Sequence, residues 1–358
     1  MRRVAITGLA CAGPFGWTTA SLREACRRQE PGGSMERIEA RRGRPHVMRV
    51  ARCAPFQRES VLTSRTLRRM GELSQIWTIC CLQAARDGGF EDLACPPERR
   101  GTFLGTGFGC TDTTWEYLRG LHADGAGMAN PFLFSESVAN APAGHSAIEL
   151  DTRGTAISLT CADASAATAV AHAARAIAHD RLDAAWCGGV EILSEPLLHV
   201  LATLAVPFAS EGAVCFLLEP LASARARGAR VHAELAGWGE ASDPAAPAVD
   251  WSINPAPMEQ ALRAALQRAP REAGQLPLSV YLHAAWEGPA RDAEQEAARR
   301  VCPEARTLEV SRRLGPLGAA GGFSLAAATL QASEAARGHG SLTVSSGWGG
   351  TIVSLLFT

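Results

Sequence analysis

Short apolar segments alternate with longer, alanine-rich segments along almost the whole chain. The short segments are four to six residues long and are nearly continuous in apolar character. That pattern is typical of strands that are buried on both faces of a sheet. We predict nine such strands, at residues 3–7, 101–104, 156–160, 184–187, 213–218, 232–236, 278–283, 307–310 and 342–345.

The alanine-rich segments between these strands are long enough to form helices. We predict five helices, at residues 73–87, 164–179, 258–267, 291–300 and 323–336. Alternating strands and helices indicate an α/β protein. Residues 243–254, which are rich in proline, alanine and aspartate, are predicted to form a surface loop.

A polar connector divides the pattern into two parts. The sequence ARARGAR, at residues 224–230, is followed at once by a new strand. The parts on either side have lengths that are ordinary for protein domains. We predict two similar α/β halves, residues 1–225 and 226–358.

The composition narrows the classes of function. Hydrophobic residues make up 47% and charged residues 20% of the chain, as in soluble globular proteins, and no apolar run is long enough to cross a membrane. The eleven cysteines are irregularly spaced, without CxxC pairs, which favours a reducing cytoplasm over a disulfide framework or a metal site. A net charge of −1 gives no reason to expect a nucleic-acid partner.

Arginine is the only long cationic residue in the chain. All 35 basic residues are arginines, which excludes lysine Schiff-base and lysine general-base chemistry. The segment from Arg23 to Arg69 holds 13 arginines against five glutamates, a local charge of +8. It is either a solvated face or a docking surface for an acidic partner.

Six segments, in order and spread over more than 300 residues, resemble motifs of the β-ketoacyl-ACP synthase family. They are VAITGLACAGPFG (4–16), SRTLRRM (64–70), NPFLFSESVANAPAGHSAIELDTRG (130–154), CGGVEI (187–192), GAAGG (318–322) and GWGGT (347–351). The resemblance implies the thiolase fold, in which two βαβαβαββ halves stack as α-β-α-β-α layers, normally in a dimer.

The family's nucleophilic cysteine lies in a T-A-C-x-S motif at a strand-to-helix turn. Counting from Gly154 or from Gly188, the position of that cysteine falls on Asp163, whereas Cys161 lies two residues earlier, inside the predicted strand. A carboxylate cannot replace the thiol, because it would have to form a mixed anhydride and would repel an incoming malonyl group. We expect Asp163 to be the N-cap of the following helix and Cys161 to be inert.

The family's other catalytic positions are also changed. His283 corresponds to the first histidine, but the turn that follows it differs from the family motif. Gly315 stands at the second histidine, Val310 at the lysine and Ser324 at the glutamate that pairs with that lysine. Four missing groups imply that no condensation takes place, and we expect neither cofactor nor metal.

His283 leaves two interpretations open. It is either a packed remnant, which is the commoner fate of a lone histidine, or it pairs with Asp163 across the former site. The second interpretation allows an acyltransferase, decarboxylase or hydrolase that uses His283 with Cys161 or Asp163.

The resemblance is strongest to the inactive chain-length factors, or ketosynthase β subunits, of type II polyketide systems. These pair with an active synthase and shape its acyl tunnel, which implies a cytoplasmic heterodimer that meets acyl carrier protein, with no nucleic acid or membrane involved. Phe108 and Trp348 occupy tunnel positions, and Arg65, Arg68 and Arg69 occupy the carrier-binding stretch. A stand-alone homodimeric acyl-binding module is the other alternative.

Overall fold

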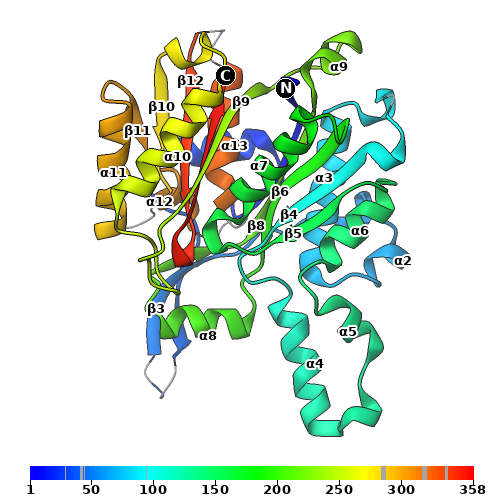
Figure 1. The fold of residues 1–358 in the computed structure, drawn as a ribbon. Coiled ribbons are helices and arrows are strands. Elements are labelled where there is room, and N and C mark those ends of the chain that lie inside the picture. The colour runs from blue at the N-terminus through cyan, green and yellow to red at the C-terminus, as the bar shows by residue number, and fades with distance from the viewer. Residues whose placement is uncertain are drawn as a thin grey trace.

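The structure is a computed structural model that describes residues 1–28, 30–40, 43, 45–93, 95–283, 288–316, 321–334 and 338–358. Within these residues the strands form one sheet of ten and one of three (Figure 1). The nine predicted strands and five predicted helices are confirmed, some with ends that differ by a few residues. Residues 318–320 of the predicted glycine turn and 335–336 of the last predicted helix lie outside the described residues.

The ten-stranded sheet consists of two series of five strands with the same order. The first series runs β1 (Val4–Ala12), β8 (Gly212–Pro220), β6 (Ala184–Glu191), β4 (Arg100–Gly105) and β5 (Ala156–Leu159). The second runs β9 (Ala233–Ser242), β13 (Thr351–Phe357), β12 (Gly340–Ser346), β10 (Leu278–Tyr281) and β11 (Arg306–Leu308).

The pairing directions also repeat. In each series the first two neighbouring pairs are antiparallel and the last two are parallel. The series meet only where residues 4–6 of β1 pair with residues 233–235 of β9. The predicted boundary after residue 225 falls in α9 (Leu221–Ala226), between the two series, and as a domain boundary it stays a prediction.

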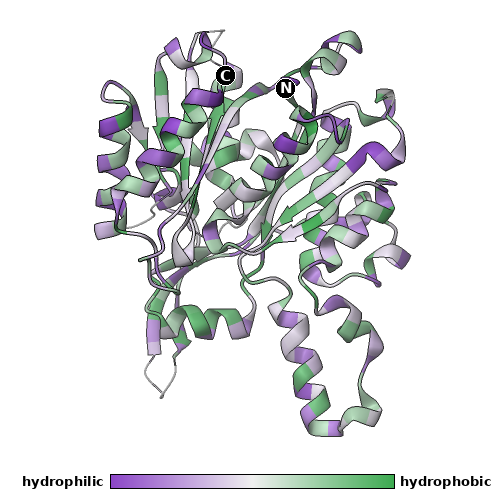
Figure 2. Cartoon of the chain, in the orientation of Figure 1, coloured by the Kyte–Doolittle hydropathy of each residue, from purple (hydrophilic) through white to green (hydrophobic). Residues whose placement is uncertain are grey.

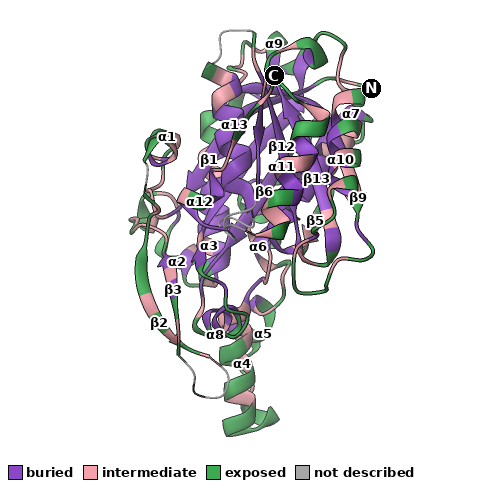
Figure 3. Cartoon of the chain, turned by 90° about the vertical axis from the view of Figure 1, so that its left-hand side faces the viewer, coloured by how far each residue is buried: buried purple, intermediate pink, exposed green. Residues whose placement is uncertain are grey.

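Helices lie on both sides of each series and complete five layers (Figure 1). The central layer contains α7 (Ser165–Ala178) and α13 (Gly322–Glu334), which share one hydrophobic core with strands of both series. The outer layers contain α3 (Glu72–Asp87) and α6 (Ala141–Glu149) on one side, and α10 (Pro255–Arg268) and α11 (Pro289–Val301) on the other. The strands between them are hydrophobic and buried, as Figures 2 and 3 show.

The remaining elements lie around the ends of this stack. The small sheet contains β2 (Ser34–Glu39), β3 (Pro45–Ala51) and β7 (Phe208–Ser210), and α8 (Glu195–Thr203) packs against it. Two helices, α4 (Thr111–Asp124) and α5 (Pro131–Glu136), project away from the layers as an arm (Figure 1). The short elements that complete the description are α1 (Thr19–Arg27), α2 (Ser64–Leu67) and α12 (Ser311–Leu314).

None of the helices in the described part of the chain combines the length and the apolar character that crossing a membrane requires.

Candidate functional site

A sharp turn connects β5 to α7 at the position where the resemblance places the nucleophile. Residues Ala162–Ala164 form a single 3-10 turn, and Ala162 has a left-handed φ of +46°. Ser165 holds this turn together, because its Oγ accepts a hydrogen bond from Cys161 N (2.8 Å) and lies 2.7 Å from Ala162 O. The strand-to-helix turn of the motif is therefore present.

Asp163 is fully buried in this turn. Its Oδ1 lies 3.5 Å from Nε2 of His283, and its Oδ2 accepts a hydrogen bond from Trp251 Nε1 at 3.2 Å. The expected N-cap role is wrong: α7 begins at Ser165 with Ala164 at the cap position and has no side-chain cap. The carboxylate instead faces the second half of the chain, because Trp251 and His283 both come from that half.

His283 is as deeply buried as Asp163, so the pairing interpretation agrees with the geometry. A second carboxylate also lies nearby, since Glu294 Oε2 accepts a hydrogen bond from the backbone N of His283 (2.9 Å). Burial alone lowers the pKa of a histidine, but Asp163 and Glu294 outweigh that effect and hold the pKa of His283 above its ordinary value. A protonated His283 can therefore form an ion pair with Asp163, but this pair supplies no thiol that could accept an acyl chain.

Cys161 lies outside the strand, which corrects the prediction that placed it in the middle of one. β5 ends at Leu159, and Cys161 is half-buried in the short link that follows. Burial raises the pKa of its thiol, and hydrogen bonds with Thr168 and Thr351 offset this only in part. The thiol form therefore prevails at neutral pH. The inertness of Cys161 stays a prediction.

Gly315 occupies the second-histidine position, and no side chain fits there. It has a φ of +86°, and a Cβ added to it would lie 2.7 Å from the side chain of Ser210 on β7. A close approach of the same kind occurs at Gly321, where an added Cβ would lie 1.9 Å from the carbonyl oxygen of Asp163. At Gly315, Ser210 of the small sheet thus fills space that a side chain would need.

The lysine and glutamate positions are filled by small uncharged groups. Val310 and Ser324 are both buried. Ser324 Oγ lies 3.1 Å from Oγ of Ser311, the residue after Val310, so the buried hydroxyl is satisfied. No charged group stands at either of these two positions.

Glu191 is a buried acid that the sequence analysis did not single out, although it is the fifth residue of CGGVEI. Its Oε2 accepts hydrogen bonds from the backbone N of Gly107 (2.6 Å) and of Phe108 (3.1 Å). Burial raises the pKa of Glu191 to about 8, with a smaller contribution from Asp163. Glu191 therefore fixes the loop that carries Phe108.

The two predicted tunnel residues are in contact. The rings of Phe108 and Trp348 meet edge to face, with centroids 5.5 Å apart. Trp251 extends the group, because its ring lies 5.9 Å from that of Trp348. Residues 243–254 are mostly exposed, as predicted for a loop, but Trp251 points from this loop to Asp163, which composition alone did not indicate.

The three arginines of the predicted carrier-binding stretch are exposed. Arg65 lies in α2, and Arg68 and Arg69 follow it directly. Within the described residues no ion pair involves any of the three, so their charges face solvent. The described part of the chain also contains no group of three or more acidic, histidine or cysteine side chains that could hold a metal ion.

Comparison with known proteins shows to which family the chain belongs. The model described as "Beta-ketoacyl synthase, N-terminal domain" matches residues 1–215. The chain belongs to the β-ketoacyl synthase family. A curated relative, the 3-oxoacyl-[acyl-carrier-protein] synthase 2 of Coxiella burnetii, is 27% identical over 307 residues, which cover 79% of this chain and 72% of the relative. A synthase of the same name from Vibrio harveyi is 27% identical over 288 residues, 73% of this chain and 69% of that protein.

Solved structures of the family have the same fold. A chain of the ishigamide ketosynthase/chain length factor superimposes with a TM-score of 0.87 and 21% identity, covering 99% of this chain and 98% of that one. A chain of the ketosynthase in complex with its chain length factor from Xenorhabdus doucetiae gives 0.81 at 16% identity, with coverage of 99% and 98%. The expected thiolase-like ketosynthase fold is therefore confirmed.

Proposed function

We propose that this chain is a catalytically degenerate ketosynthase subunit of the chain-length-factor type. It pairs with an active β-ketoacyl synthase and shapes the acyl tunnel in a type II polyketide or polyene pathway. The observation that carries the proposal is the buried group at the nucleophile turn, where Asp163 faces His283 at 3.5 Å and accepts a hydrogen bond from Trp251. A condensing enzyme needs a thiolate at this place.

The surroundings of Asp163 support loss of chemistry rather than a new nucleophile. Gly315 has no room for a histidine side chain beside Ser210, and Val310 offers no charge. The raised pKa of Cys161 argues against the alternative acyltransferase that would use its thiolate beside His283. Aspartate provides no thiol on which an acyl thioester could form.

Two surfaces favour a partner subunit over a monomer. β5 is the outermost strand of its series, and among the described residues it pairs on one side only, with β4, which leaves its other edge open. Large apolar side chains are exposed on the neighbouring helices, including Trp115 (54% exposed) on α4 and Ile148 (76%) on α6. In the family this strand pairs across a dimer axis, and exposed apolar groups of this kind mark protein interfaces.

The similar solved structures support an active ketosynthase as the partner subunit. Two of the solved structures that superimpose on the chain carry a chain length factor in their descriptions, one of them in complex with its ketosynthase. We therefore propose a heterodimer rather than the alternative homodimeric acyl-binding module. Since all eleven cysteines are free thiols, we place this complex in the reducing cytoplasm.

The pair of Phe108 and Trp348 gives the proposal a measurable consequence. If Phe108 closes the tunnel floor, Phe108→Ala should lengthen the product of the complex without abolishing turnover. The measurement is mass spectrometry of the products that the chain and its active synthase make together. Phe56→Ala serves as the matched control, because Phe56 is a half-buried phenylalanine stacked on Trp17, outside the site. An unchanged product length in the Phe108 variant would contradict the tunnel role.

A further inference from the structure

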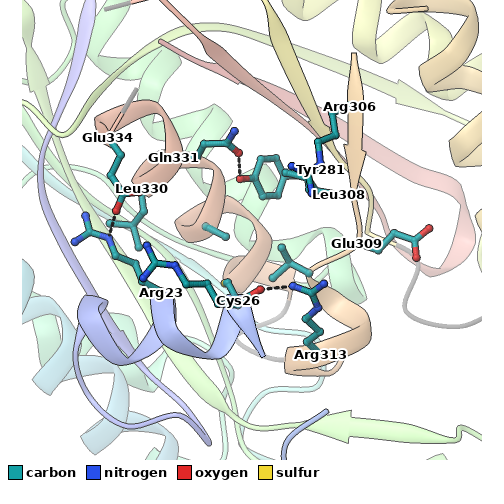
Figure 4. A pocket seen from close by; sticks show the side chains of 13 residues that line it. Arg23, Cys26, Tyr281, Arg306, Leu308, Glu309, Arg313, Leu330, Gln331 and Glu334 are labelled. Carbon is teal, nitrogen blue, oxygen red and sulfur yellow. Dashed lines mark hydrogen bonds and ion pairs between the residues drawn. The ribbon is translucent and has the colours of Figure 1, made fainter. Parts of the chain in front are cut away.

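A cavity of about 360 Å³ lies where α1 of the first half meets the second half of the chain. Its walls come from α1, β10, β11, α12 and α13, and Figure 4 shows the side chains that line it. Val310, which stands at the family's lysine position, contributes to one wall. The cavity therefore shares the segment around α12 with the degenerate centre, but neither Asp163 nor His283 lines it.

The charges on the wall are unbalanced. Four arginines line the cavity but only two glutamates do, and both glutamates are already neutralised. Glu334 lies 2.8 Å from Arg23, and Glu309 is paired from outside the cavity by Arg291 (2.8 Å) and by Arg312 (3.1 Å).

Three of the lining arginines are left without a carboxylate. Arg27, Arg306 and Arg313 form no ion pair with any residue that the structure describes. Arg313 donates one hydrogen bond, to the backbone oxygen of Cys26, which holds its guanidinium at the cavity (Figure 4). Guanidinium groups recognise carboxylates and phosphates through paired hydrogen bonds, so this wall favours an oxyanion.

Part of the wall is apolar. Leu308, Val310, Ala327 and Leu330 line it, together with the ring of Tyr281. The hydroxyl of Tyr281 is already used, because it donates to Oε1 of Gln331 inside the cavity (Figure 4). This side therefore offers a surface for an apolar group rather than for a second charge.

We propose that this cavity binds a small amphiphilic anion, in which a phosphate or carboxylate group is attached to a compact apolar group. The anionic end lies between Arg306 and Arg313, and the apolar end lies against Leu308, Ala327 and Leu330. The volume is at the lower end of the range for small-molecule sites, roughly 300–1,000 Å³, which suits such a ligand. The proposal does not depend on the function proposed for the degenerate centre.

Phenyl phosphate is a suitable probe because it has both features. Isothermal titration calorimetry of the full chain at low ionic strength should show saturable binding that weakens as salt is added. Phenol, which lacks the anion, should bind at least tenfold more weakly, and so should inorganic phosphate, which lacks the apolar group. A parallel titration with benzoate distinguishes a carboxylate ligand from a phosphate ester, and tight binding of either one supports the site.

Substitutions of lining residues then test whether phenyl phosphate binds in this cavity. Arg306→Gln and Arg313→Gln should each weaken phenyl phosphate about tenfold, which is the effect of losing one charge-assisted contact. Arg299→Gln is the matched control, since Arg299 is exposed on α11, is paired with Glu296 and does not line the cavity. Ala327→Leu should weaken phenyl phosphate more than inorganic phosphate, because it fills the apolar end.

The proposal is overturned if no saturable binding of phenyl phosphate or benzoate is found, or if Arg306→Gln and Arg299→Gln have equal effects. Equal affinity for phenyl phosphate and phenol would also overturn it. Arg306 is exposed, so its variant keeps the test decisive even if Arg313→Gln disturbs folding through the lost contact with Cys26.

Discussion

Trp251 donates a hydrogen bond from its indole nitrogen to the carboxylate of Asp163 across 3.2 Å. The two residues come from different halves of the chain, and the contact brings an aromatic ring to the carboxylate at the strand-to-helix turn. Trp348 packs edge to face against the same indole, with ring centroids 5.9 Å apart. Asp163 is therefore connected through Trp251 to a pair of packed indole rings.

Restoring the thiol alone should not restore condensation. In the variant Asp163→Cys the new thiol would have His283 nearby, but the lysine and second-histidine positions would still hold Val310 and Gly315. We expect less than about 1% of the activity of an intact synthase, since each missing acid–base group costs about 10²-fold or more. The measurement is ketoacyl product formation with acyl and malonyl carrier protein, and robust product formation by this variant would contradict the account.

The paired histidine predicts how stability depends on pH. The pKa of His283 is raised in the folded state, so its contribution is fully present below the unfolded pKa of about 6.5 and is lost as pH rises through the higher folded value. Urea unfolding of the wild type and of His283→Gln should differ by about 1 kcal/mol near pH 6, and by less near pH 9.

An exposed histidine provides the control for this experiment. His122→Gln on α4 should change the free energy of unfolding little at any pH. A difference between wild type and His283→Gln that grows from pH 6 to pH 9 would show that the imidazole is buried in its neutral form, without a charged partner.

The exposed arginines should bind the carrier protein through charge. Replacing Arg65, Arg68 and Arg69 by glutamate should weaken binding of acyl carrier protein at least tenfold, and wild-type binding should decrease steeply with salt. The control makes the same charge change at Arg181, Arg225 and Arg271, which are also exposed. Surface plasmon resonance at two salt concentrations measures both, and equal effects of the two triple variants would assign the binding to net charge alone.

The strands and helices of the layers could be predicted because their residues are buried on both sides, which leaves continuous apolar or alanine-rich segments. β13 was nevertheless absent from the predicted strands, although its sequence TIVSLLF is a continuous apolar segment of the same kind. The small sheet was missed for a different reason: β2 has exposed and half-buried positions only, so it carries no buried apolar run.

The positions in the site that lie in or near a family motif could be predicted from the sequence. Position counting placed Asp163 at the nucleophile turn, and the turn is there. The roles of Trp251 and Glu191 were not accessible in this way, because they depend on contacts between distant segments: Trp251 reaches Asp163 from a polar loop, and Glu191 binds backbone groups of Gly107 and Phe108. Residues 284–287, which differ from the family's turn after the first histidine, lie outside the described residues.

The most direct test of the central claim is native mass spectrometry of the chain co-expressed with an active ketosynthase from the same organism, after incubation with acyl carrier protein that bears an acyl group. We predict a one-to-one complex in which the acyl mass is found on the active synthase only. An acyl adduct on this chain, or a homodimer that excludes the synthase, would contradict the account.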